Sequence, residues 1–144
     1  AADGEGAADF AVSAERPERG AIEVLLRHGV AEADLHVYRC AGAFELGPLT
    51  QRVAQTGRYD AVIALGAVIR GGTPHFEHVA GACTASLREV AMSARCAVAF
   101  GLLTCDTMEQ AIDRAGGKAG NKGEEAALAA IEQASIFRAI EEGE

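Results

Sequence analysis

Residues 70–75, RGGTPH, bring together a cation, two glycines, a hydroxyl and an imidazole. The backbone N–H groups of a glycine pair, the Thr73 hydroxyl and the start of a following helix can together form a cradle for an anion. His75 near that helix start should favour its neutral form, which can accept or relay a proton near neutral pH. The segment therefore predicts an anion site with a proton-transfer group, and a purely structural histidine is the alternative.

His78 follows His75 by three residues, and two histidines at this spacing on a helix can hold a metal ion. No third ligand is evident nearby in the sequence, so we expect no metal site. Nothing else in the residue pattern asks for a redox cofactor, so we expect the chemistry to need no cofactor.

A second candidate lies at residues 41–45, AGAFE. Gly42 between two alanines lets the backbone approach a ligand closely, Phe44 offers a ring for stacking, and Glu45 offers two acceptor oxygens. The alternative is a tight turn in which Phe44 packs into the core and Glu45 faces solvent.

A third candidate is the segment 114–123, RAGGKAGNKG, which holds three cations and four glycines. Cations with free backbone donors suggest binding of an oxyanion. The segment differs from a P-loop because Asn121 replaces the second glycine, Gly123 replaces the hydroxyl residue, and a helix rather than a strand precedes it. The alternative is a glycine-rich turn between two helices with surface lysines.

The elements that must position these groups alternate between strands and helices. The run AVIALGAVI at 61–69 is apolar without alternation, which predicts a strand covered on both faces. Strands are expected at 10–13, 35–40, 61–69 and 96–104, and helices through His28, at 47–55 with Pro48 in the first turn, at 76–94, at 106–115 and from 121 onward. This order predicts an α/β fold, a parallel sheet with helices on both sides.

Composition narrows the class of protein further. A length of 144 residues predicts one domain at 10–144, preceded by a flexible acidic leader at 1–9. The net charge of −8 argues against nucleic acid or an anionic membrane as partner, and the longest apolar run is too short to span a bilayer. The four cysteines are irregularly spaced in apolar segments, so we expect buried thiols and a reducing cytoplasmic location.

Three motifs, taken in order, resemble the lumazine synthases of riboflavin biosynthesis: GAFE at 42–45, GAVIRGGTPHFEHV at 66–79, and FGLLTCDTMEQAIDRAGGKAGNKGEEAA at 100–127. The resemblance implies a flavodoxin-like three-layer sandwich with a four-stranded parallel sheet, whose N-terminal segment can add an edge strand in a neighbour. It also implies condensation of 5-amino-6-(D-ribitylamino)uracil with 3,4-dihydroxy-2-butanone 4-phosphate. The products are 6,7-dimethyl-8-ribityllumazine, inorganic phosphate and water, with no metal or cofactor.

The resemblance also implies roles for residues at the matching motif positions. His75 would transfer protons, and Arg114 would grip the phosphate with donors from Gly72 and Thr73. The remaining positions would bind substrate: Ala43, Phe44 and Glu45 the ribityl chain and pyrimidine, Val68 and Ile69 the pyrimidine pocket, Phe100 as an aromatic from the neighbouring subunit, and Lys122 near the phosphate.

Assembly is implied in the same way. In this family the site lies between subunits of a pentamer, and the GGKAGNKG turn resembles members whose twelve pentamers close into an icosahedral 60-mer. Such a shell can enclose riboflavin synthase. An alanine-rich chain with few aromatics suits close helix packing between identical subunits.

One departure from the family stands after the first strand. Family members usually carry an aromatic there that stacks on the pyrimidine, followed by a longer first helix. Here Ser13 and Ala14 run directly into residues 15–20, ERPERG, which contain no aromatic. Two functions therefore stay open: an active lumazine synthase, or a self-assembling shell with impaired catalysis.

Overall fold

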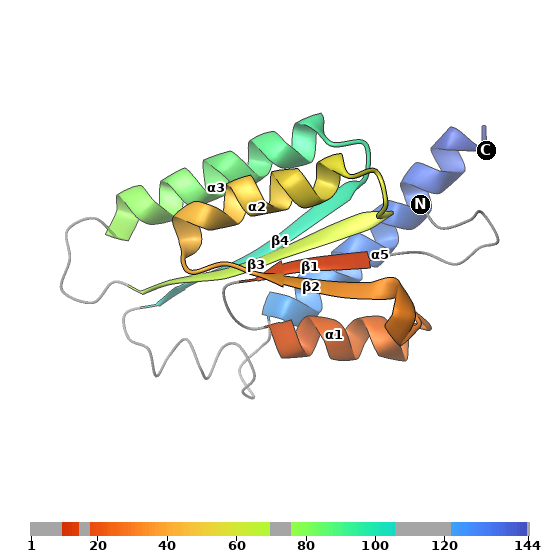
Figure 1. The fold of residues 1–144 in the computed structure, drawn as a ribbon, viewed down its shortest axis with the longest axis horizontal. Coiled ribbons are helices and arrows are strands. Elements are labelled where there is room, and N and C mark those ends of the chain that lie inside the picture. Colours follow the sequence, from red (N-terminus) through yellow and green to blue (C-terminus); the bar gives the residue numbers. More distant parts are fainter. Residues whose placement is uncertain (1–9, 15–17, 70–75, 106–121, 144) are drawn as a thin grey trace.

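The computed structural model describes residues 10–14, 18–69, 76–105 and 122–143 of the chain. Within these residues the central sheet has four parallel strands in the order β2-β1-β3-β4 (Figure 1). The strands are β1 (Phe10–Ala14), β2 (Leu35–Arg39), β3 (Ala61–Ile69) and β4 (Ala97–Cys105). The predicted four-stranded parallel sheet is therefore confirmed.

Helices cover both faces of this sheet. Helices α2 (Ala43–Gln55) and α3 (Phe76–Ser93) lie side by side on one face, and α1 (Glu18–Arg27) and α5 (Lys122–Glu141) lie on the other (Figure 1). A short 3-10 helix, Glu32–Asp34, leads into β2. This arrangement is the expected three-layer α/β sandwich, whereas the helix predicted at 106–115 lies outside the described residues.

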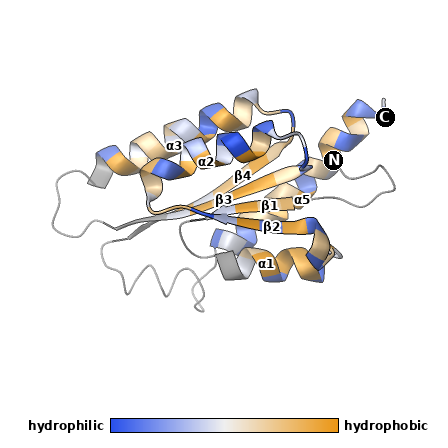
Figure 2. Ribbon diagram, in the orientation of Figure 1, coloured by the Kyte–Doolittle hydropathy of each residue, from blue (hydrophilic) through white to orange (hydrophobic). Residues whose placement is uncertain are grey.

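The core is built around β1 and β3, the two central strands of the sheet. All five residues from Ala61 to Leu65 of β3 have no exposed surface, which confirms the prediction from its unbroken apolar run. The hydropathic colouring shows mostly apolar residues along β1, β3 and β4, and a mixture of polar and apolar residues on the helices (Figure 2). The larger core cluster joins β1, β3, α1 and α5, and a second cluster joins α2 and α3 to β3.

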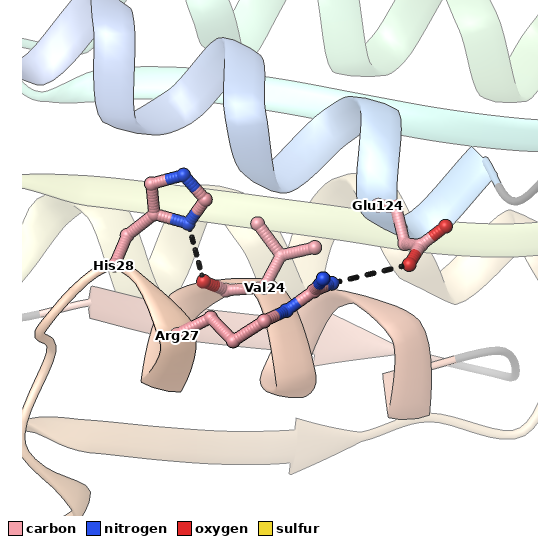
Figure 3. A network of polar contacts seen from close by, with 4 residues as sticks. All are labelled: Val24, Arg27, His28 and Glu124. Carbon is pink, nitrogen blue, oxygen red and sulfur yellow. Dashed lines mark hydrogen bonds and ion pairs between the residues drawn. The ribbon is translucent and has the colours of Figure 1, made fainter.

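Helix α1 buries one face against the core and ends close to the predicted position at His28. Ala21, Val24 and Leu25 are buried, and Gly29 takes the positive φ of +91° that ends a helix without steric strain. Just before this glycine, the His28 ring donates from Nδ1 to the Val24 carbonyl at 2.8 Å (Figure 3).

Helix α2 begins four residues earlier than predicted. Gly42, in extended conformation, precedes its first turn, and the Glu45 backbone N–H donates to the Gly42 carbonyl at 3.2 Å. Pro48 therefore lies inside the helix instead of in its first turn, and the sequence-based start at Gly47 is wrong. Because proline has no N–H, the helix forgoes the bond that residue 48 would donate to the Phe44 carbonyl.

Among the described residues no cysteine forms a disulfide, and the prediction of buried thiols holds for only one of the three described cysteines. Cys83 is buried, whereas Cys40 and Cys96 are partly exposed. Burial raises the pKa of the Cys96 thiol above its ordinary value. In the described part of the chain, no helix is both long and apolar enough to cross a membrane.

Candidate active site

The first turn of α2 presents two of the predicted substrate-binding side chains to solvent. Phe44 is 59% exposed and Glu45 is exposed as well, while Ala43 beside them is buried against the α2–α3 core cluster. An aromatic ring of this size usually packs inside unless a partner covers it. The alternative in which Phe44 fills the core is therefore wrong, and the ring is free to stack on a ligand.

Two contacts fix α2 on the sheet and on its neighbouring helix. Ser13 on β1 and Thr50 on α2 are fully buried and share a hydrogen bond of 2.7 Å between their hydroxyls. Gly47 lies so close to α3 that an added Cβ would stand 2.8 Å from the Ser86 Cβ. Neither of these contacts was predicted from the sequence; the signal available was a glycine and three hydroxyl residues within the predicted strands and helices.

The carboxyl end of β3 holds two further predicted site residues. Val68 and Ile69 are its last two residues and stand opposite Thr104 and Cys105 of β4. The carboxyl end of β3 lies at the sheet edge where open parallel sheets bind ligands, and residues 70–75 follow β3 in the sequence. Gly72, Thr73 and His75 themselves lie outside the described residues, as does Arg114.

The structure brings Phe100 and Lys122 together in one groove along the outer edge of β4. The groove has a volume of about 520 Å³ and is flanked by Thr84 of α3 and Glu125 of α5. Phe100 is 37% exposed, and the Lys122 ammonium lies 3.4 Å from the Glu125 carboxylate. A ring and a cation therefore line the same groove, at an edge of β4 that no described strand pairs.

Gly101 makes this groove possible. An added Cβ at Gly101 would lie 2.7 Å from the backbone carbonyl oxygen of Lys122, closer than real Cβ atoms come to any oxygen. The first residue of α5 can therefore rest directly on β4 only because position 101 lacks a side chain. Sequence analysis did not single out this glycine, although it stands between two residues of a matched motif.

The groove residues do not all lie on the sheet face opposite α2. Phe100 stands opposite Ala64 of β3, which packs against α2 and α3, and the groove is lined by Thr84 of α3. Phe44 and Glu45 come from α2, which packs with α3, whereas Lys122 begins α5, which packs with α1 on the opposite face (Figure 1). Among the described residues, no cluster of three or more His, Cys, Asp or Glu side chains could hold a metal ion. His78 is exposed on α3.

A polar cluster that the sequence analysis missed ties β2 to the residues before β3. The hydroxyls of Tyr38 and Tyr59 lie 2.6 Å apart, and Arg58 donates to the Tyr59 hydroxyl at 2.8 Å. The hydrogen bond with Tyr59, together with burial, raises the pKa of Tyr38 above its ordinary value. The cluster belongs to the packing of the β2 edge.

A cavity of about 380 Å³ lies at the opposite, amino-terminal edge of the sheet. Its lining includes Phe10, the first residue of β1, and Asp60, which directly precedes β3. Asp60 pairs with Arg138 of α5 at 3.8 Å. Because ligands of open parallel sheets bind at the carboxyl ends of strands, this cavity is not the candidate site.

Comparisons with known proteins agree with the motifs. The family model for 6,7-dimethyl-8-ribityllumazine synthase matches residues 8–138. A protein of that name from Anaeromyxobacter dehalogenans (strain 2CP-C) is 64% identical over 121 residues, which cover 84% of this chain and 75% of the relative. Another from Anaeromyxobacter sp. (strain Fw109-5) is 61% identical over 119 residues, 83% of this chain and 73% of the relative. The chain therefore belongs to the 6,7-dimethyl-8-ribityllumazine synthase family.

Proposed function

We propose that this chain is a working lumazine synthase. It condenses 5-amino-6-(D-ribitylamino)uracil with 3,4-dihydroxy-2-butanone 4-phosphate, giving 6,7-dimethyl-8-ribityllumazine, inorganic phosphate and water in riboflavin biosynthesis. The observation that carries the proposal is the 64% identity to a relative of that name over 84% of the chain. The exposed ring and carboxylate on the first turn of α2 supply a matching place for a heterocycle with a hydroxylated side chain.

Each reaction requirement has a residue assigned to it in this proposal. Joining an amine to a ketone with loss of water needs proton transfer, which we assign to His75. Departure of phosphate needs positive charge and donors, which we assign to Arg114, Gly72 and Thr73. These four residues lie outside the described residues, so their support is their position within the matched motifs.

The remaining roles divide between the start of α2, the end of β3 and the groove at the β4 edge. Ala43, Phe44 and Glu45 bind the ribityl chain and pyrimidine, with Val68 and Ile69 lining the pyrimidine pocket. Phe100 and Lys122 face the groove at the β4 edge instead. A complete site then forms when the β4 edge of one subunit meets the α2 side of another, with Phe100 supplied across the interface and Lys122 near the phosphate.

This division supports a homo-oligomer. The outer edge of β4 carries backbone groups that no described strand pairs, and its groove includes a partly exposed aromatic. We extend the proposal to pentamers that close into a 60-subunit shell, with riboflavin synthase as the enclosed partner. The free thiols among the described residues suit a reducing cytoplasmic location.

Formation of the fluorescent lumazine from the two substrates tests the activity. A rate equal to the uncatalysed background would refute it. Arg114→Ala should raise the KM for the butanone phosphate selectively, because the lost cation faces only that substrate. An equal loss for both substrates would contradict the assigned role.

The assembly needs a separate measurement. Native mass spectrometry or negative-stain microscopy should show a hollow 60-mer, and a stable pentamer or decamer alone would refute the shell. The alternative of a catalytically impaired shell depended on the missing aromatic near residues 15–17, which lie outside the described residues. No structural or comparative finding favours that alternative.

A further inference from the structure

Helices α2 and α3 come into close contact at Gly47 and Ser86. Gly47 is buried, and a Cβ built on it would lie 2.8 Å from the Ser86 Cβ. The Ser86 hydroxyl could rotate away from such a group, but its Cβ is fixed to the backbone of α3. No ordinary side chain fits at position 47 unless one helix moves.

This contact lies one helical turn from the exposed residues Phe44 and Glu45. Both belong to the same short helix as Gly47, so a displacement of the helix at Gly47 carries them with it. To reach the 3.4 Å at which ordinary van der Waals contact begins, α2 would have to move by about 0.6 Å. A shift of this size at a positioned binding group is enough to weaken a substrate complex.

Helix propensity alone would favour alanine over glycine at position 47. Alanine favours a helix interior more than glycine does. A glycine inside α2 therefore makes the isolated helix less stable. The close approach to α3 gives the reason for a glycine at position 47, because an added Cβ would clash with Ser86. Gly81 on α3 offers a natural comparison, because a Cβ added to it would meet nothing within 4 Å.

We propose that Gly47 is a positioning residue for lumazine formation: its contact with Ser86 sets where Phe44 and Glu45 lie for the ribitylaminouracil. The inference rests on the proposed function and deepens it, because it separates the two substrates. The butanone phosphate is assigned to groups on other elements, so its binding should not depend on this contact.

The test compares Gly47→Ala with the matched control Gly81→Ala. Gly47→Ala should raise the KM for the ribitylaminouracil by roughly threefold to tenfold, while the KM for the butanone phosphate stays within about twofold. Gly81→Ala should leave both constants unchanged and raise the melting temperature, because it adds helix propensity without a clash. Gly47→Ala should lower the melting temperature despite the same gain in propensity.

Substitutions of Ser86 on α3 test whether the contact with position 47 itself causes the change in KM. Ser86→Gly in the Gly47→Ala background removes the obstructing Cβ and should restore the KM. Ser86→Ala keeps the Cβ and should not, although it too removes the hydroxyl that donates to the Cys83 carbonyl at 3.0 Å. If Gly47→Ala does not fold, Ser86→Val in the native background places a methyl group where the hydroxyl lies and should raise the same KM.

Three results would overturn the inference: an unchanged KM for the ribitylaminouracil, an equal rise for both substrates, or equal rescue by Ser86→Ala and Ser86→Gly. A wild-type protein that forms no lumazine would instead refute the proposed function. In that case the affinity for the product lumazine, followed by its fluorescence, still ranks the same variants. The expected order is weaker lumazine binding by Gly47→Ala, restored by adding Ser86→Gly but not by adding Ser86→Ala. Any other order would overturn the positioning role of Gly47.

Discussion

The start of α2 and the groove at the β4 edge are each held by a glycine at a close approach, but the neighbouring atoms differ. At Gly47 the neighbour is the side chain of Ser86, whereas at Gly101 it is the backbone carbonyl of Lys122. A side chain can be exchanged by mutation, but a backbone carbonyl cannot. The α2 side can therefore be retuned by a second substitution, while the geometry of the β4 edge is fixed.

The two regions also differ in what they offer a ligand. The start of α2 presents a ring and a carboxylate, Phe44 and Glu45, and the groove presents a ring and a cation, Phe100 and Lys122. The carboxylate suits the hydroxyls of a sugar-like chain, and the cation suits a phosphate. The difference in charge matches the two substrates of the proposed reaction.

The largest effect should follow from breaking the β4 side. Gly101→Ala forces a Cβ against the Lys122 carbonyl, so either β4 or the start of α5 must shift. Overpacking of this kind should lower the free energy of unfolding by about 3 kcal/mol. Urea denaturation measures the loss, with Gly81→Ala as the control. A Gly101→Ala protein as stable as wild type would show that α5 does not rest on β4 at this point.

A smaller effect should follow from loosening the α2 side. Thr50→Val leaves the buried Ser13 hydroxyl without its partner, which should cost about 1–2 kcal/mol of unfolding free energy. The double variant Ser13→Ala with Thr50→Val should lose less than the sum of the single changes, because both polar groups are then gone. Additive losses in denaturation experiments would mean that the hydroxyls do not interact.

The charge of the groove can be removed with little structural cost. Lys122→Ala breaks only an exposed ion pair, since the two side chains are 53% and 68% exposed, so stability should change by less than about 0.5 kcal/mol. If Lys122 lies near the phosphate, the KM for the butanone phosphate should rise about fivefold. Lys122→Arg should keep most of the affinity, and a rise for the ribitylaminouracil instead would reverse the assignment of the two sides.

The smallest effect concerns the surface tie between α1 and α5. Arg27 reaches Glu124 at 3.4 Å, and the two side chains are 66% and 41% exposed (Figure 3). Glu124→Gln should change the free energy of unfolding by no more than about 0.5 kcal/mol, and less at high salt. A larger loss of stability in thermal unfolding would show that α5 depends on this ion pair more than on its contact with Gly101.

The elements with unbroken or strongly periodic patterns were predictable from the sequence. The apolar run of β3 and the Ala21, Val24 and Leu25 face of α1 both indicate burial directly, and both are buried. The start of α2 was not predictable from Pro48. Proline is common in a first turn, and only packing around Ala43 and Leu46 shows that the helix starts earlier.

The site was predictable as residue types but not as an arrangement. Glycines, a histidine, an arginine and the GAFE segment indicated chemistry because they combine backbone donors, a cation and a proton-transfer group, and two of the three segments follow predicted strands. Whether Phe44 fills the core or faces solvent was open, since both fit the same spacing. Burial depends on neighbours distant in sequence, so only the structure decided that the ring is exposed.

By itself, the sequence determined the α/β class, the strand order along the chain and the family, because hydrophobic periodicity and motif spacing are local properties. The tertiary structure decided which residues meet. It placed Phe100 and Lys122 in one groove at the β4 edge, put Glu45 on α2, on the sheet face opposite α5, and set two close approaches at Gly47 and Gly101. Close approach depends on the absence of a Cβ opposite a particular atom, and no pattern along one chain reveals which atom that is.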